Sequence, residues 1–81
     1  MGYKIKEVSE ISGISIRMLR HYDKNGLLWP DVILPNGYRN YSQSNIDRLQ
    51  KIMYLKELDF SVSNMKKILD GSAEDMIIAL Q

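Results

Sequence analysis

Positively charged side chains recur at helical spacing in the first third of the chain. Arg17, then Arg20 or His21, then Lys24 follow at intervals of three to four residues, which places them on one side of a helix. A helix fits the major groove of DNA, where its cationic side chains meet phosphates and base edges. Taken alone, such a stripe is more often a solvated surface than a binding surface, by roughly two to one. A binding role therefore needs a second element beside it.

A second segment supplies aromatic and cationic side chains together. Tyr38, Arg39 and Tyr41 follow the turn sequence Asn36-Gly37, and an Asn-Gly pair between two apolar runs predicts a β-hairpin. A two-stranded ribbon is marginally stable by itself, so its base must pack on the helices while its tip reaches outward. Hairpin tyrosines often only pack across strands, but beside a cationic helix we interpret this hairpin as a DNA-binding wing.

Apolar spacing and capping residues predict the elements that carry these side chains. The expected helices begin near Ile5, Ile16, Ser42, Ser61 and Ser72, and the expected strands cover 32–34 and 38–41. The first two helices are separated by a turn of about four residues that contains Gly13, which is the helix-turn-helix pattern. The predicted fold class is therefore mainly α with a small β-hairpin, a winged helix-turn-helix.

Within the second helix we expect different roles for individual residues. Residues near the N-terminus of such a helix reach base edges, so Ser15, Arg17 and Met18 are predicted to lie closest to the bases. Tyr22 is expected to pack its ring in the core and to touch the DNA backbone with its hydroxyl. His21 is expected to be a neutral, partly exposed contact residue, because a lone histidine makes neither a metal site nor, by default, a proton switch.

The apolar pattern also predicts which side chains are buried. Ile11 continues the apolar face of the first helix, and Leu58 closes the broad apolar face of the third helix. Trp29 is expected to pack under the wing rather than to lie exposed.

Three separated motifs resemble the mercury-resistance regulator (MerR) family. They are Ser15-Ile16-Arg17-Met18-Leu19-Arg20-His21-Tyr22-Asp23, Gly26-Leu27-Leu28, and Asn36-Gly37-Tyr38-Arg39-Asn40-Tyr41-Ser42, in one register over residues 3–71. The run 55–61 is similar to the family's stretch between its third and fourth helices. Two positions depart from the family: Lys4 stands where a capping Thr or Ser is frequent, so that cap is expected to be poorer, and Asn45 stands where an acid usually completes a capping box.

The resemblance implies a DNA-binding domain at 1–71 and, at 72–81, the start of a coiled-coil helix that forms a homodimer. It also implies that Arg39 contacts phosphate, and that the dimer binds double-stranded promoter DNA with RNA polymerase as a further partner. An effector, sensed by a missing C-terminal region, would make the dimer bend and untwist the promoter.

Composition limits the alternatives. Net charge is +1, but residues 1–41 carry six Lys/Arg against four Asp/Glu, so the basic excess lies with the predicted binding elements. There is no cysteine and no long apolar run, which fits a cytoplasmic, nucleoid-associated protein without a membrane partner. We find no catalytic, metal or cofactor motif and predict that the chain is not an enzyme. The alternatives are an excisionase-like architectural DNA binder and a helical protein-interaction module that uses the apolar residues at 76–80.

Overall fold

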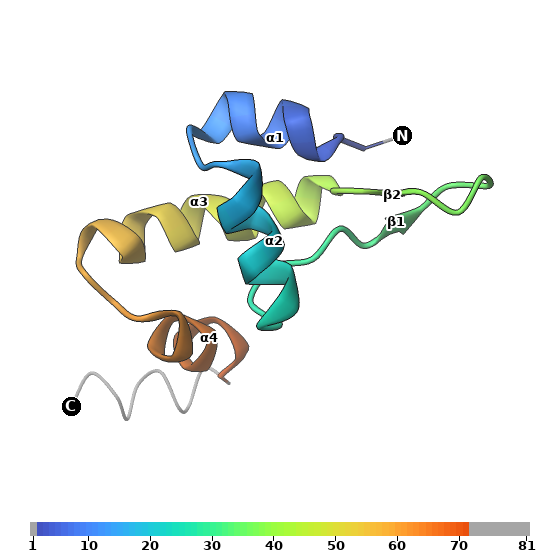
Figure 1. The fold of residues 1–81 in the computed structure, drawn as a ribbon. Helices are drawn as coiled ribbons and strands as arrows, with labels where there is room; N and C mark the ends of the chain where they lie inside the picture. The colour runs from blue at the N-terminus through green and yellow to red at the C-terminus, as the bar shows by residue number, and fades with distance from the viewer. Residues whose placement is uncertain (1, 72–81) are drawn as a thin grey trace.

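The computed structural model describes residues 2–71, and Figure 1 shows their arrangement. In chain order the elements are α1 (Ile5–Ser12), α2 (Ile16–Lys24), β1 (Val32–Ile33), β2 (Arg39–Asn40), α3 (Gln43–Glu57) and α4 (Val62–Asp70). This confirms the predicted mainly helical fold with a small hairpin. The helix expected from Ser72 lies outside the described residues.

Local signals set the turn between α1 and α2. Gly13 adopts a left-handed conformation with φ of 75° after the end of α1, a backbone geometry that glycine takes without steric cost. The hydroxyl of Ser15 then accepts a hydrogen bond from the backbone N–H of Met18 (3.1 Å) and begins α2. At the start of α1, the Lys4 side chain makes no capping hydrogen bond, but the Lys4 backbone N–H donates to Glu7 Oε1 (3.1 Å).

The end of α2 is closed by a Schellman motif. Gly26 has φ of 72°, and its N–H donates to the Asp23 carbonyl (3.1 Å), while the Leu27 N–H donates to the Tyr22 carbonyl (2.9 Å). The chain then leaves the helix with Leu27 and Leu28 fully buried. The path from α2 into the hairpin is therefore fixed by backbone hydrogen bonds and by core packing.

One hydrophobic core joins all four helices to the base of the hairpin. Its fully buried members come from α1, α2, the turn after α2, the segment after β2, α3 and α4: Val8, Leu19, Tyr22, Leu27, Leu28, Tyr41, Ile52 and Met65. Because a domain of this size buries only about three-fifths of its unfolded surface, each of these side chains is a large share of the core.

The hairpin projects from this core as a two-stranded ribbon (Figure 1). Val32 pairs with Asn40 and Ile33 with Arg39 in antiparallel register. At the tip the Gly37 N–H donates to the Leu34 carbonyl (2.9 Å), and Gly37 has φ of 87°. This is a turn closed by a left-handed glycine, a frequent three-residue hairpin loop, so the predicted hairpin is confirmed.

The base of the hairpin is held from two sides. Tyr3 and Tyr41 exchange two backbone hydrogen bonds of 2.8 and 2.7 Å. Asn45 Oδ1 accepts from the backbone N–H of Ser42 (2.9 Å) and of Asp31 (3.2 Å). The amide therefore completes the capping box of α3 in place of the usual acid, and it also fixes the chain that enters β1.

Three burial predictions are wrong. The exposed fractions are 69% for Ile11, 54% for Leu58 and 46% for Trp29. Ile11 lines a hollow between α1 and α3, and Leu58 is the residue that follows the last turn of α3. Trp29 follows the buried Leu28 and lines a hollow with Ser44 and Arg48 of α3.

Candidate nucleic-acid interface

The outer face of α2 carries its charged side chains and the inner face carries the core residues. Arg17, Arg20, His21 and Lys24 are all exposed, whereas Leu19 is fully buried. The predicted separation of a cationic face from an apolar face is therefore confirmed. Helical spacing alone was sufficient for this prediction, because the helix bounds are the predicted ones.

The first turn of α2 holds the residues that we predicted to lie closest to the bases. Ser15 is exposed, and its oxygen accepts the Met18 N–H as the helix cap; its hydroxyl hydrogen can still be donated outward. Met18 is half-buried against the core, and Arg17 between them is exposed. Of the three, Arg17 has the side chain with the reach and the donors for a base edge.

An ion pair joins the wing to α2. Arg39 Nη2 of β2 lies 3.3 Å from Asp23 Oδ2 of α2, and the two side chains are 49% and 35% exposed. This contact brings the guanidinium of the wing to the helix that carries the cationic face. No role was predicted for Asp23, because a contact between residues 16 positions apart has no local sequence signal.

Two of the predicted DNA-binding tyrosines are buried. Tyr22 and Tyr41 are each 1% exposed, so their rings belong to the core that joins α2 to the base of the wing. Burial raises the pKa of both hydroxyls. At Tyr41 the Asp23 carboxylate raises the pKa further, while Arg20 and Arg39 lower it. Charged groups of α2 and of the wing therefore converge on this hydroxyl.

The raised pKa values of Tyr22 and Tyr41 predict that the folded protein loses stability at alkaline pH. The pKa values of both hydroxyls are raised in the folded protein above the ordinary value of 10.0. Their contribution to the free energy of unfolding is therefore complete below pH 10.0 and is lost as the pH rises through the pKa values of the folded protein. We expect the free energy of unfolding, measured by urea denaturation, to fall above about pH 10. Tyr41→Phe should flatten this fall, whereas Tyr38→Phe, at a side chain 73% exposed, should not. If both variants flattened the fall equally, the buried tyrosines would not be its cause.

The tip of the wing is free of the core. Tyr38 is 73% exposed and Ile33 is 75% exposed, and the Tyr38 N–H is held by Asn36 Oδ1 (3.1 Å). Of the wing residues predicted to bind DNA, Tyr38 is thus presented outward at the tip, Arg39 is held beside α2, and Tyr41 anchors the base.

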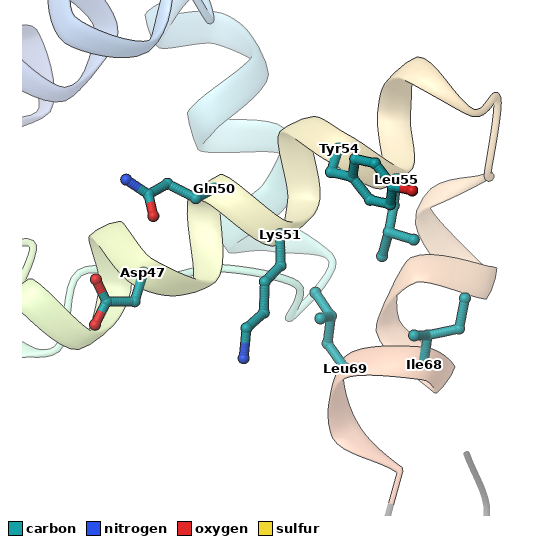
Figure 2. Close-up of a pocket in the computed structure, with 7 residues that line it drawn as sticks. All are labelled: Asp47, Gln50, Lys51, Tyr54, Leu55, Ile68 and Leu69. Atoms are coloured by element: carbon teal, nitrogen blue, oxygen red, sulfur yellow. The ribbon is translucent and has the colours of Figure 1, made fainter. Parts of the chain in front are cut away.

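A separate apolar groove runs between α3 and α4. It has a volume of about 450 Å³, and Figure 2 shows its lining residues, Asp47, Gln50, Lys51, Tyr54, Leu55, Ile68 and Leu69. None of them belongs to α2 or the hairpin, so the groove is not part of the candidate nucleic-acid interface.

Residues 2–71 hold no cluster of side chains suited to bind a metal ion. Within the same residues no helix has the length and apolar character needed to cross a membrane.

The chain is similar to known transcription regulators. The family model described as MerR HTH family regulatory protein matches residues 3–72. The chain is 46% identical over 81 residues to the HTH-type transcriptional activator mta of Bacillus subtilis, covering all of this chain and 32% of that protein. It is 39% identical over 75 residues to the HTH-type transcriptional activator TipA of Streptomyces coelicolor, covering 93% of this chain and 30% of that protein. The chain thus spans about a third of the length of these curated relatives.

Solved structures agree with these matches. The N-terminus of the Bacillus subtilis multidrug transporter activator superposes with a TM-score of 0.86 at 46% identity, covering 98% of this chain and 74% of that chain. The regulator SkgA from Caulobacter crescentus gives a TM-score of 0.85 at 36% identity, covering 99% of this chain and 58% of that chain. The predicted winged helix-turn-helix is confirmed, and so is the prediction of a non-enzymatic regulator. The chain belongs to the MerR HTH family of regulatory proteins and is a DNA-binding domain of that family.

Proposed function

We propose that α2 of this chain enters the major groove of promoter DNA while the wing lies along the flanking backbone. Ser15, Arg17 and Met18 then face the bases, and Arg20, His21, Lys24, Tyr38 and Arg39 meet phosphates. The rings of Tyr22 and Tyr41 stay in the core, and only their hydroxyls contact the DNA backbone, at the edge of the interface. Phosphate contacts set the position of the domain, and base contacts supply the sequence preference.

The observation that carries the proposal is the contact between Arg39 and Asp23. It brings the wing against the helix whose outer face holds four exposed basic or imidazole side chains. A helix and a hairpin joined in this way can engage adjacent parts of one duplex, which is how winged helix-turn-helix domains bind.

The whole regulator acts, in this proposal, as a cytoplasmic homodimer that joins through a helix beginning near Ser72. Two copies bind an inverted-repeat promoter element, and a region beyond this chain senses an effector. The dimer then bends and untwists the promoter so that RNA polymerase can use it. Because bending a site of this length costs about 1–6 kcal/mol, many phosphate contacts from both copies are needed.

A competition titration tests this function. Fluorescence anisotropy of a chain that includes the full dimer helix, with an inverted-repeat promoter duplex and with a scrambled duplex over a range of salt concentrations, should show tighter binding to the promoter. Residues 1–81 alone should bind weakly and without sequence preference at physiological salt. It should also show affinity that falls as salt rises, because bound counterions are released from the phosphates. Equal affinity for both duplexes without salt dependence would contradict the proposal and would favour a protein-interaction role.

Replacement of Arg39 should weaken all DNA binding by a similar factor. Arg39→Ala removes a predicted phosphate contact, so affinity for promoter and scrambled duplexes should fall together and the salt slope should decrease by about one. Anisotropy titrations at several salt concentrations measure both quantities. Ile33→Ala, at an exposed residue of β1 that pairs with Arg39, serves as the control for a general disturbance of the hairpin. A selective loss of promoter binding in Arg39→Ala would show that the wing reads bases.

A further inference from the structure

One arginine of α3 holds two segments that are far apart in the sequence. Arg48 Nε donates to the Leu27 carbonyl at 2.7 Å, and Arg48 Nη2 donates to Asp70 Oδ1, also at 2.7 Å. Its side chain is 24% exposed. Both contacts are short, and both use the charged guanidinium, whose planar donors can serve two acceptors at once.

The two partners of Arg48 lie at the ends of two helices. Leu27 closes the Schellman motif of α2, since its N–H bonds the Tyr22 carbonyl. Asp70 is the last residue of α4, directly before Gly71. Arg48 thus connects the C-terminal end of α4 with the turn that fixes the C-terminal end of α2. A second residue of α4 also reaches this turn, because a Cβ at Gly26 would lie 3.1 Å from the Lys66 Nζ.

Neither its place in α4 nor its ion pair makes Asp70 a strong contributor to stability. A negative charge in the last turn of a helix opposes the helix dipole, so Asp70 does not stabilise α4 by its position alone. The pair is also partly exposed, with Asp70 44% accessible, and such pairs contribute little to stability. A structural purpose is therefore a weak explanation for this contact.

We propose that Arg48 is a positioning residue that couples the end of α4 to the orientation of α2. A change in the Arg48–Asp70 contact moves the Arg48 guanidinium, and the Arg48–Leu27 hydrogen bond carries the change to the end of α2. The inference rests on the proposed function, because α2 is the helix that is proposed to read DNA.

The variant Asp70→Asn in the full chain tests the coupling. It removes the ion pair, leaves the Arg48–Leu27 hydrogen bond possible, and relieves the unfavourable charge at the end of α4, so the fold should persist. In ¹H–¹⁵N spectra of the free protein we expect amide shifts at Leu27, Leu28 and the last turn of α2. In competition titrations we expect the preference for promoter over scrambled duplex to change by about threefold to tenfold.

Two further variants separate coupling from a general effect of lost charge. Asp70→Glu keeps the carboxylate and should restore both readouts. Asp59→Asn makes the same chemical change at a left-handed residue with φ of 63°, which asparagine tolerates, and should change neither. Amide shifts confined to α4, or an unchanged preference, overturn the proposal. A wild-type chain without preference for the promoter would refute the proposed function instead, and the amide shifts alone would then decide the coupling.

Discussion

Replacing Arg17 by alanine should reduce affinity for the promoter duplex by about 5- to 150-fold, the range expected for one well-formed contact to a base edge. Affinity for scrambled DNA should change much less, because non-specific binding is governed by phosphate contacts. The reason lies in the position of Arg17: it is exposed in the first turn of α2, directly after the capping Ser15. Parallel anisotropy titrations with the two duplexes measure the ratio.

Lys24→Ala is the matched control for this prediction. Lys24 is also an exposed cation of α2, but it lies in the last turn of the helix, away from the end that approaches the bases. It should weaken binding to both duplexes by a similar factor. If Arg17→Ala behaved in the same way, Arg17 would be a phosphate contact and the assignment of base-reading residues would be wrong.

Leu19→Ala should have the largest effect on stability. Leu19 is fully buried on the inner face of α2, and truncation of a buried leucine costs about 2–5 kcal/mol. A domain of this size has a free energy of unfolding of only about 4–12 kcal/mol, so the variant should be close to unfolding at room temperature. Urea denaturation followed by circular dichroism measures the change.

Ile11→Ala provides the comparison within the same helix-turn-helix. Its side chain is 69% exposed, so the change should stay within about 0.5 kcal/mol. Comparable losses from Leu19→Ala and Ile11→Ala would mean that α1 and α2 pack differently from the arrangement described.

Elements with a local signal were predictable from the sequence. Ser15 caps α2 by accepting a hydrogen bond from the Met18 N–H three residues further on, and Gly13 ends α1 by its own left-handed conformation. The Asn36-Gly37 pair likewise predicts the hairpin because a left-handed glycine closes its tip. The exposure of the cationic stripe followed from helical spacing once these bounds were set. Signals that act within a few residues of the chain therefore account for most of the fold prediction.

Tertiary contacts could not be predicted in the same way. The pairing of Asp23 with Arg39 and of Arg48 with Asp70 depends on how helices and hairpin pack, and charges far apart in sequence leave no periodic trace. The burial of Tyr41 was also missed, because the wing pattern does not say which tyrosine faces the core. Trp29 shows the opposite error: burial was predicted from its aromatic type, but it lies at the surface, where it lines a hollow beside α3.

The central claim is that the outer face of α2 and the wing form one surface that binds a duplex. Titration of the ¹⁵N-labelled chain with promoter DNA, followed by amide chemical shifts, tests it most directly. The largest shifts should fall on residues 15–24 and 34–39, while the α3–α4 groove around Tyr54 and Ile68 stays unchanged. Shifts centred on that groove, with α2 unaffected, would contradict the claim.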